Sequence, residues 1–220
     1  MKKRVIAIDG PSGSGKSTVS RILAERLGYL YVNTGDMYRA CGVLAKRWGI
    51  PFDDEEKLEQ FLKGLKFSFY EGKLIVNGED LSNVIRSEEA GKLASDISKV
   101  PIVRKILVEI QRELGKDGVV MEGRDIGTNV FPDTPYKFFL DASPDVRAER
   151  RAKELKSMGM DVSIEEIKRK IMERDKQDRE RRINPLRPAD DAVIIDTSYM
   201  TVEEVVERIE AIIHEKDNKS

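Results

Sequence analysis

Short apolar runs recur along the chain and alternate with segments of helical periodicity. The runs that read as buried strands are residues 5–8, 29–32, 118–121, 136–140 and 192–195. Between the first two, residues 16–27 repeat apolar positions every three to four residues and end before Gly28, a common helix terminator. Strands that alternate with helices predict an α/β fold, with a five-stranded parallel sheet covered by helices on both faces.

One region breaks this alternation. Residues 53–65 read as a short acidic helix, and residues 67–70 and 73–76 read as strands. Turns are expected at Glu71-Gly72 and at Asn77-Gly78. We expect a small β-meander within an insert over residues 52–87. The pattern leaves open whether the insert is a mobile flap over a site or a structural decoration.

Residues 86–115 read as mostly helical, with an interruption near Val100-Pro101. After the interruption, the spacing predicts a buried face made of Ile102, Ile106 and Ile110. Arg104 and Arg112 are then expected to point elsewhere.

The first predicted strand leads directly into a Walker A pattern, G-P-S-G-S-G-K-S at residues 10–17. Its glycines allow backbone N–H groups to surround an anion. Lys16 is expected to reach the β- and γ-phosphates, and the Ser17 hydroxyl to reach Mg²⁺. The residues expected to bind ATP are Gly10, Pro11, Ser12, Gly13, Ser14, Gly15, Lys16, Ser17 and Thr18.

The composition limits the cellular compartment and the classes of partner that the chain can have. The chain has 220 residues, of which 36% are charged, yet its net charge is only −1, so no global field favours nucleic acid or a membrane surface. The single cysteine, Cys41, excludes an internal disulfide and fits a reducing compartment. No apolar stretch approaches the length of a membrane span. We expect a cytoplasmic protein with no nucleic-acid or membrane partner.

Arginines follow the predicted strands at the edge where ligands bind in open α/β sheets. Arg39, near the start of a predicted helix, opposes the helix dipole unless an anion holds it, which favours phosphate binding. Arg124 and Asp125 lie between glycines and offer a donor fork beside an acceptor. Arg174, Asp178 and Arg181 fall on one expected helix face. That face fits either solvated ion pairs or bidentate phosphate contacts.

The only histidine, His214, lies near the end of the last predicted helix, so no histidine base is available. A Walker A loop with arginines in three segments therefore suggests phosphoryl transfer to an acceptor that is itself a phosphate, because such an oxygen needs little activation.

With these motifs the chain resembles the bacterial-type cytidylate kinases, which are nucleoside monophosphate kinases that make (d)CDP and ADP from (d)CMP and ATP. The resemblance covers nearly the whole chain. It rests on I-D-G-P-S-G-S-G-K-S-T, N-T-G-D-M-Y-R at 33–39, V-P-I-V-R at 100–104, E-G-R-D-I-G-T at 122–128, F-L-D-A-S at 139–143 and E-R-D-K-Q-D-R-E-R at 173–181.

The resemblance implies roles for individual residues. The CMP phosphate would meet Thr34, Arg39, Arg124 and Arg181, with Tyr38 and Gly123 beside them. Cytosine would be read by Ser95, Arg104 and Asp125, and the ribose would be held by Arg174 and Asp178. The catalytic cations would be Lys16, Arg124 and Arg181, with Arg150 and Arg151 from a lid. Mg²⁺ would accompany ATP. Independently of the resemblance, we expect a monomer.

The same resemblance implies a division of the chain into a P-loop core at residues 1–33, 100–146 and 169–220, a monophosphate-binding region at 34–99 and a lid at 147–168. Two positions depart from the family pattern. Asn33 stands where the family more often has Asp, and Asp36 stands where a small residue is usual. An added carboxylate near the incoming phosphate affects phosphate affinity unless it points outward.

Three other hypotheses remain at this point. A kinase for UMP or AMP would share the fold and differ in the base site. A nucleotide-gated switch protein would use the arginines to dock a partner. A nucleic-acid-associated ATPase would use the arginines of residues 169–182, although the carboxylates between them weigh against it.

Overall fold

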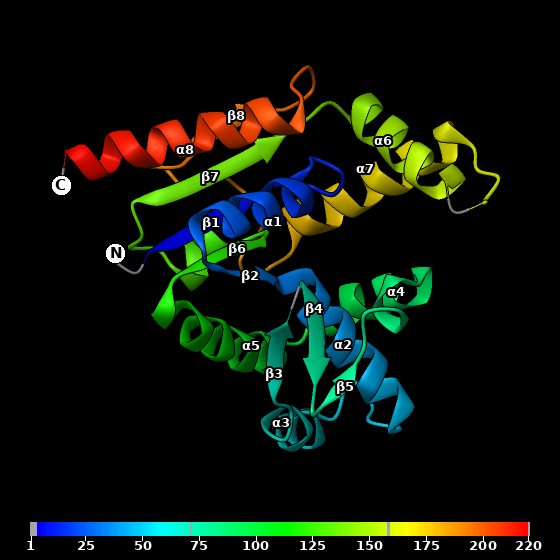
Figure 1. Ribbon diagram of the computed structural model, residues 1–220. Coiled ribbons are helices and arrows are strands. Elements are labelled where there is room, and N and C mark those ends of the chain that lie inside the picture. Colours follow the sequence, from blue (N-terminus) through cyan, green and yellow to red (C-terminus); the bar gives the residue numbers. More distant parts are fainter. Residues whose placement is uncertain (1–3, 71, 158, 220) are drawn as a thin grey trace.

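The computed structural model describes residues 4–70, 72–157 and 159–219. Its main sheet has five strands in the order β2-β6-β1-β7-β8, and all pairings are parallel (Figure 1). The strands are β1 (Val5–Asp9), β2 (Leu30–Asn33), β6 (Val119–Gly123), β7 (Tyr136–Asp141) and β8 (Val193–Asp196). The predicted five-stranded α/β fold is confirmed.

The register brings the carboxyl ends of the central strands to one edge. Asp9 at the end of β1 is opposite Gly123 of β6 and Phe139 of β7, and Asn33 at the end of β2 is opposite Glu122. The segments that follow these strands therefore leave the sheet side by side, where ligands bind in open α/β sheets.

Helices cover both faces of the sheet, and the alternation of side chains along β1 separates the two cores. Ile6 and Ile8 pack with α1 (Lys16–Leu27) and α8 (Val202–Asn218). Ala7, between them, faces the other core, which includes side chains of α2 (Thr34–Arg47) and α5 (Pro101–Leu114). In Figure 1, α1 and α8 lie on one side of the sheet, and α2 and α5 lie on the other.

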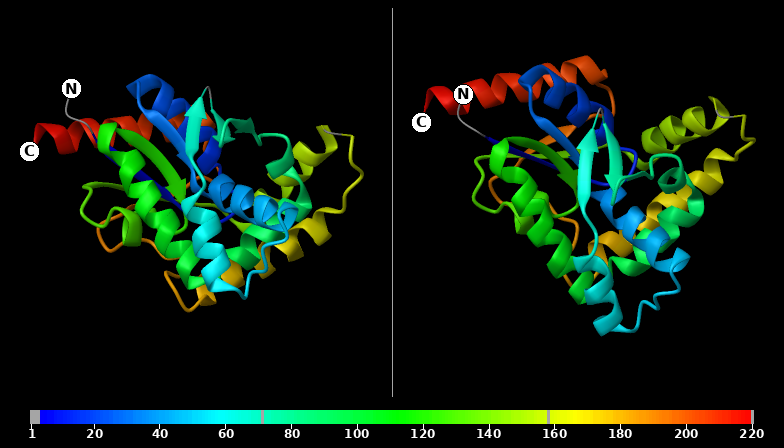
Figure 2. Two further views of the ribbon diagram at one scale, coloured as in Figure 1. Left: turned by 90° about the horizontal axis from the view of Figure 1, so that it is seen from below. Right: turned by 60° about the horizontal axis from the view of Figure 1, so that its bottom comes forward.

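The predicted β-meander is present after helix α3 (Glu55–Lys63). Its antiparallel strands are β3 (Phe67–Tyr70), β4 (Lys73–Val76) and β5 (Glu79–Asp80). Figure 2 shows this small sheet in front of the main body. Leu62 and Leu74 belong to the same buried cluster as Met37 of α2. These contacts fix the insert to the core, whereas its motion as a flap stays a prediction. Glu71, in the first predicted turn, lies outside the described residues.

The helical region after the insert is divided where the sequence predicts. A 3₁₀ turn (Val84–Arg86) precedes α4 (Glu88–Ile97), and α5 begins at Pro101. The predicted buried face of α5 is partly wrong. The buried apolar residues are Val103, Ile106, Leu107 and Val108, while Ile102 and Ile110 are only partly buried. Arg104 is also buried, at 3% exposure, because Asp125 neutralises its guanidinium inside the protein.

The last two helices before β8 form a hairpin. Helix α6 (Pro144–Ser157) packs on α7 (Ile164–Glu180) through a small apolar cluster that includes Ala148 and Ile171. This hairpin contains the predicted lid, of which residue 158 lies outside the described residues. Arg181 was predicted on the same helix face as Arg174 and Asp178. Instead, α7 ends one residue earlier and Arg181 has extended backbone (ψ 140°).

Two short segments flank β6. A 3₁₀ turn (Gly115–Asp117) precedes it, and a π-helical turn (Ile126–Val130) follows the G-R-D segment. None of the helices in the described parts of the chain is both long and apolar enough to cross a bilayer.

Candidate active site

The phosphate loop has the conformation that its glycines predict. Gly10, Gly13 and Gly15 all have positive φ, at 147°, 79° and 90°. A Cβ atom on Gly10 would lie 2.0 Å from the carbonyl oxygen of Leu140, so the loop is packed against the end of β7. Only glycine combines this backbone with such a close approach. The loop opens α1 at Lys16, where free backbone N–H groups favour an anion.

Lys16 is folded back onto the loop. Its Nζ donates to the carbonyl oxygen of Pro11 at 2.6 Å and lies 3.5 Å from the Ser14 hydroxyl oxygen. Burial, followed by the positive charge of Arg124, lowers the pKa of Lys16 to about 7. Glu122 and Asp9 offset only part of this effect, and a triphosphate would supply further negative charge to the buried amine. Ser17, the next residue, is exposed.

Two arginines of α6 brace the loop from outside. Arg147 donates to the Ser12 carbonyl at 3.1 Å and pairs with Asp175 of α7 at 2.6 Å, and it is almost fully buried. Arg150 donates to the Thr197 carbonyl at 2.6 Å, and the Thr197 hydroxyl donates to the Ser14 carbonyl at 3.0 Å. Arg151 points elsewhere: it is exposed and pairs with Glu154. Thr197 is a loop contact that the sequence did not indicate.

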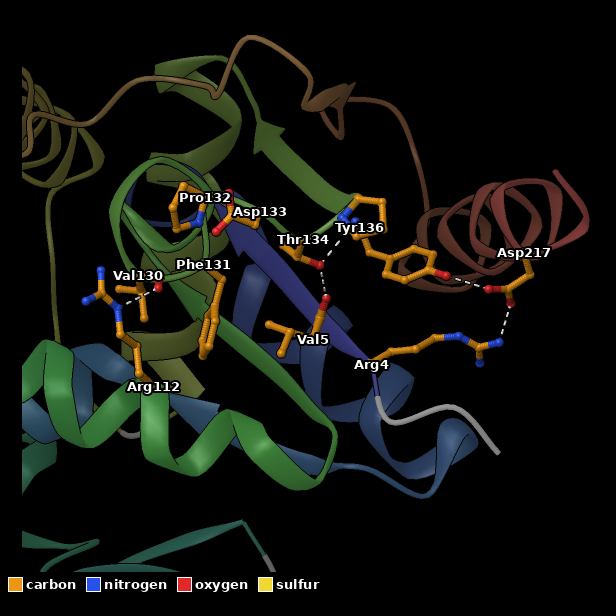
Figure 3. A pocket seen from close by; sticks show the side chains of 11 residues that line it. Arg4, Val5, Arg112, Val130, Phe131, Pro132, Asp133, Thr134, Tyr136 and Asp217 are labelled. Carbon is orange, nitrogen blue, oxygen red and sulfur yellow. Dashed lines mark hydrogen bonds and ion pairs between the residues drawn. The ribbon is translucent and has the colours of Figure 1, made fainter. Parts of the chain in front are cut away.

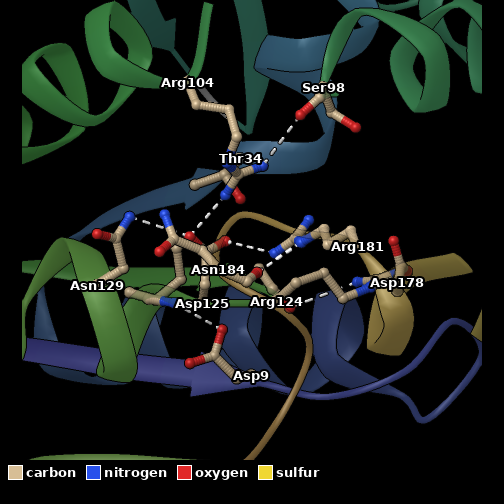
Figure 4. A network of polar contacts seen from close by, with 12 residues as sticks. Asp9, Thr34, Ser98, Arg104, Arg124, Asp125, Asn129, Asp178, Arg181 and Asn184 are labelled. Atoms are coloured by element: carbon tan, nitrogen blue, oxygen red, sulfur yellow. Dashed lines mark hydrogen bonds and ion pairs between the residues drawn. The ribbon is translucent and has the colours of Figure 1, made fainter. Parts of the chain in front are cut away.

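A second group of charges lies beside the loop (Figure 4). Asp125 is its centre: it accepts from Arg104 at 2.6 Å, from Arg181 at 3.1 Å and from the Asn129 amide at 3.1 Å. Arg124 pairs with Asp178 at 2.8 Å. We call Arg104, Arg124, Asp125, Asp178 and Arg181 the acceptor-side network. It joins α5, the loop after β6 and the end of α7, so the structure brings together residues that the sequence separates widely.

The network carries excess positive charge. The pKa of Arg174 is lowered to about 10, mainly by burial and next by the positive charge of Arg124. Burial opposes ionisation of Asp178, but Arg124, Arg174 and Arg181 together outweigh it and lower the pKa of this carboxyl. In addition, Nε of Arg104 is buried and has no hydrogen-bond partner among the described residues. The site is therefore prepared for an anion and keeps a spare donor.

A carboxylate that the sequence did not single out joins the two ends of the site. Asp9, at the end of β1, accepts the backbone N–H groups of Ile126 at 2.9 Å and Gly127 at 2.8 Å. It thereby fixes the turn that carries Asp125 against the strand that carries the phosphate loop. Burial raises the pKa of Asp9 to about 6. No local motif signals this role, because its partners lie more than a hundred positions away.

Comparison with known proteins identifies the family of the chain. The family model for cytidylate kinase matches residues 6–215. The chain belongs to the cytidylate kinase family. It is 49% identical over 215 residues to a cytidylate kinase of Thermotoga petrophila, and the aligned region covers 97% of this chain and 98% of the relative. It is 46% identical over 217 residues to one of Citrifermentans bemidjiense, at 96% and 93% coverage.

The fold is also found in a more distant solved structure. An uncharacterised protein from Eubacterium ventriosum superposes with a TM-score of 0.53 at 13% identity, covering 97% of this chain and 99% of that one. This likeness shows the fold alone, whereas the family-model match and the relatives of nearly 50% identity confirm the predicted family. Family membership favours the kinase expectation over the switch protein and the nucleic-acid-associated ATPase.

Within this family member, the start of α2 lies next to the acceptor-side network. The Thr34 hydroxyl donates to the Glu122 carbonyl at 2.8 Å, and a Cβ on Gly123 would lie 2.6 Å from that hydroxyl oxygen. The Tyr38 ring lies under Arg104, whose guanidinium carbon is 5.6 Å from the ring centroid. Burial raises the pKa of Tyr38 to about 12.

Arg39, near the start of a helix, is paired with an anion as expected. The anion is the carboxylate of Asp36 rather than a bound phosphate. Nη1 of Arg39 donates to Asp36 at 2.8 Å, one helical turn earlier. Asn33 accepts the backbone N–H of Asp36 and caps the helix. The two positions that depart from the family pattern therefore act together at the beginning of α2.

Ser95 of α4 contacts α7 next to a network residue, since Gln177 precedes Asp178. The Ser95 hydroxyl donates to Gln177 of α7 at 3.3 Å, and this contact connects α4 with the helix that carries Arg174 and Asp178.

A cavity of about 880 Å³ lies at the opposite edge of the sheet (Figure 3). Its lining includes Arg4 and Val5 at the start of β1, Tyr136 at the start of β7, and Arg112 and Asp217. None of the predicted site residues lines it. The parallel strands place their starts away from the phosphate loop, so this cavity does not contribute to the site.

Proposed function

We propose that the chain transfers the γ-phosphoryl group of ATP directly to the phosphate of CMP or dCMP, forming ADP and the cytidine diphosphate. The observation that carries this proposal is the acceptor-side network, which lies at the same sheet edge as the phosphate loop. Its arginines suit a phosphate, and its carboxylates suit the donors of a nucleoside. Both kinds of group are needed to bind a nucleoside monophosphate.

The donor end would be the phosphate loop, residues 10–18. Backbone N–H groups and Lys16 would contact the β- and γ-phosphates, and Lys16 would exchange the Pro11 carbonyl for phosphate oxygens. Arg150 is close by, since one of its nitrogens lies 3.9 Å from where a Cβ of Gly15 would be. We therefore include Arg150 among the cations of the donor end. Arg151, exposed and paired with Glu154, stays a prediction that requires rearrangement of the lid.

The residues present also fit Mg²⁺. The Ser17 hydroxyl is an exposed oxygen next to Lys16, and Mg²⁺ needs few protein ligands because phosphate oxygens and water supply the rest. No group of three histidine, cysteine, aspartate or glutamate residues in the described ranges forms a separate metal site. When bound with ATP, the ion would neutralise part of the charge on the phosphate oxygens.

The acceptor phosphate would be held by Thr34, Arg39, Arg124 and Arg181. Arg124 and Arg181 now bind Asp178 and Asp125, so binding of CMP would exchange one anionic partner for another at a preformed position. Preformed ion pairs keep the guanidinium groups oriented and lower the entropy lost on binding. Tyr38 and Gly123 would support these ligands from the start of α2 and the end of β6.

Asp125 and Arg104 are suited to read cytosine. The carboxylate would accept the exocyclic amine, and the free Nε–H or other guanidinium donors of Arg104 would meet N3 and O2. Ser95 would add a hydroxyl to this base site. Arg174 and Asp178 would contact the ribose. A base with a carbonyl in place of the amine would meet Asp125 as a like-polarity acceptor, which disfavours uracil.

In the transfer step, an oxygen of the CMP phosphate would attack the γ-phosphorus of ATP. The bond between that phosphorus and the β,γ-bridging oxygen would break, and ADP would leave with its electron pair. The attacking oxygen is already anionic, so no general base is required. Lys16, Arg124 and Arg181 would stabilise the charge on the transferred group, and closure of residues 147–168 would exclude water.

The division into a core, a monophosphate-binding region at 34–99 and a lid at 147–168 belongs to the proposal, as does a monomeric enzyme. The α6–α7 hairpin supports it, since α6 carries Arg147 and Arg150 against the loop and α7 carries Asp178 and Arg174 toward the acceptor. A hairpin that contacts both substrates is suited to close when both are bound.

The test is ADP formation from Mg-ATP with CMP, dCMP, UMP, AMP or GMP, each against a blank without acceptor. We expect fast turnover confined to CMP and dCMP. Turnover with another nucleotide would retain the fold and refute the assignment of the base site. ADP formation that is independent of any acceptor would refute the kinase proposal.

A further inference from the structure

The ion pair at the beginning of α2 differs from the others in the site. Asp36 lies in the first turn of the helix and accepts from Arg39 at 2.8 Å, and both side chains are partly buried, at 30% and 27% exposure. Asp125 and Asp178 also pair with arginines, but the proposed function gives those carboxylates contacts with the base and the ribose. Asp36 has no comparable contact with substrate. Its partner is the arginine that should receive the phosphate.

Asp36 is also held in place close to Arg39, the arginine that would bind the substrate phosphate. Its side chain is short, its backbone N–H is bonded to Asn33, and the positive end of the helix dipole favours its charge. Arg39 lies close enough to Arg174 to lower its pKa, as does Arg124, so Arg39 faces the same group of cations. A phosphate bound among them would approach Asp36 with like charge.

We propose that Asp36 is a built-in competitor of the substrate phosphate for Arg39, and that it weakens binding of CMP and of the diphosphate product. The inference rests on the proposed function, in particular on Arg39 as a phosphate ligand. When the phosphate binds, Arg39 either leaves Asp36 or is shared with it. Either case reduces the affinity of the site for ligands that carry a phosphate, and neither changes its affinity for the nucleoside.

A second role for Asp36, support of the helix start, must be separated from competition. Loss of helix support would affect all ligands of the site alike. Loss of competition would affect only phosphate-bearing ligands, and would improve their binding. Cytidine, which has the base and ribose of CMP without the phosphate, therefore distinguishes the two roles.

The experiment is equilibrium titration of CMP and of cytidine into the full chain, without ATP. Asp36→Asn removes the charge and keeps the side-chain size. We expect its dissociation constant for CMP to fall about tenfold, with that for cytidine unchanged within about twofold. Glu113→Gln is the matched control, since Glu113 near the end of α5 forms an exposed (i,i+3) pair with Lys116 of the following 3₁₀ turn. It should change neither constant.

Substitution of Arg39 completes a double-mutant cycle with Asp36→Asn. Arg39→Ala should weaken CMP, and Asp36→Asn added to Arg39→Ala should bring no further change, because the competition acts through that arginine. The inference would be overturned if Asp36→Asn bound CMP no more tightly than the wild type, or if it tightened cytidine binding by the same factor. In either case, turnover of CMP by the wild-type chain would leave the proposed function intact. Failure of the wild-type chain to phosphorylate CMP would refute the proposed function itself.

Discussion

At the donor end of the site, the chain offers an anion a curved run of backbone N–H groups and one lysine whose hydrogen bonds go to neutral oxygens. At the acceptor end, it offers arginines that are already bound to carboxylates of the same chain. The donor end can bind a phosphate by adding contacts, whereas the acceptor end must exchange them. This difference makes binding at the donor end depend on backbone shape and on the protonation of Lys16. Binding at the acceptor end depends on a balance between internal and external anions.

The largest expected effect separates the two ends through Arg124. Arg124→Ala removes a phosphate ligand and leaves Asp178 buried without its partner, a change that costs about 2–5 kcal/mol in comparable charge pairs. We expect kcat/KM for CMP to fall about 10³-fold and the dissociation constant of ATP to change less than about threefold. Steady-state kinetics and an ATP titration measure both. Equal losses for ATP and CMP would show that the ends are not independent.

A smaller effect is expected from the base site. Asp125→Asn retains the shape of the side chain but replaces one acceptor oxygen by a donor, which can meet the carbonyl of uracil. Because a hydrogen bond to a charged group contributes about 1.5–3 kcal/mol, the preference for CMP over UMP should fall about 30-fold. Competition between the two nucleotides measures it. Asn129→Ala, which removes only a neighbour of Asp125, should retain most of the preference.

Asp9 tests the connection between the ends. Asp9→Asn keeps one acceptor for the N–H groups of Ile126 and Gly127 but turns an amide donor toward the other. We expect kcat/KM for CMP to fall about tenfold, ATP affinity to change little, and the free energy of unfolding to fall by about 1–3 kcal/mol. Urea unfolding and kinetics measure these effects. A loss of stability with unaltered kinetics would reduce Asp9 to a purely structural residue.

The smallest expected effect is the pH dependence of ATP binding. Burial, followed by Arg124, lowers the pKa of Lys16 to about 7 in the free protein, and bound phosphates favour its ammonium form. Above pH 7 the free protein must therefore take up a proton to bind ATP, so the dissociation constant should rise with pH. We expect an increase of about eightfold between pH 7.5 and 8.5. Lys16→Arg, which stays charged, should show a flat profile, and a slope equal to wild type would contradict the assignment to Lys16.

The two ends also differ in how far the sequence predicts them. The donor end is contained in residues 5–18, so its strand, turn and helix follow from local chemistry. The acceptor end is not local. Arg104 and Asp125 are 21 positions apart and Arg124 and Asp178 are 54 apart, and no spacing rule pairs them. The residues alone indicated a binding loop at Arg124 and Asp125, but the specific contacts with base, ribose and phosphate were expected only through resemblance to a family.

The role of Asp9 was missed for the same reason, although Asp9 lies within the Walker A motif region. The partners of Asp9 are backbone N–H groups 117 and 118 positions away. Arg104 was expected outside the core because helix periodicity ranks arginine as polar, and only the buried Asp125 explains its place. The anion that holds Arg39 was expected to be a phosphate, although Asp36 at (i,i+3) was visible in the sequence.

The most direct test of the account is whether the two ends bind their ligands at the same time, adjacent to one another. An analogue that links adenosine and cytidine through five phosphates carries both substrates in one molecule, and linked ligands gain the effective concentration of the second site. We predict that it competes with both ATP and CMP and binds at least about 100-fold more tightly than either alone. Competition with ATP only, at the affinity of ATP, would contradict the claim that this edge of the sheet is one site for direct phosphoryl transfer.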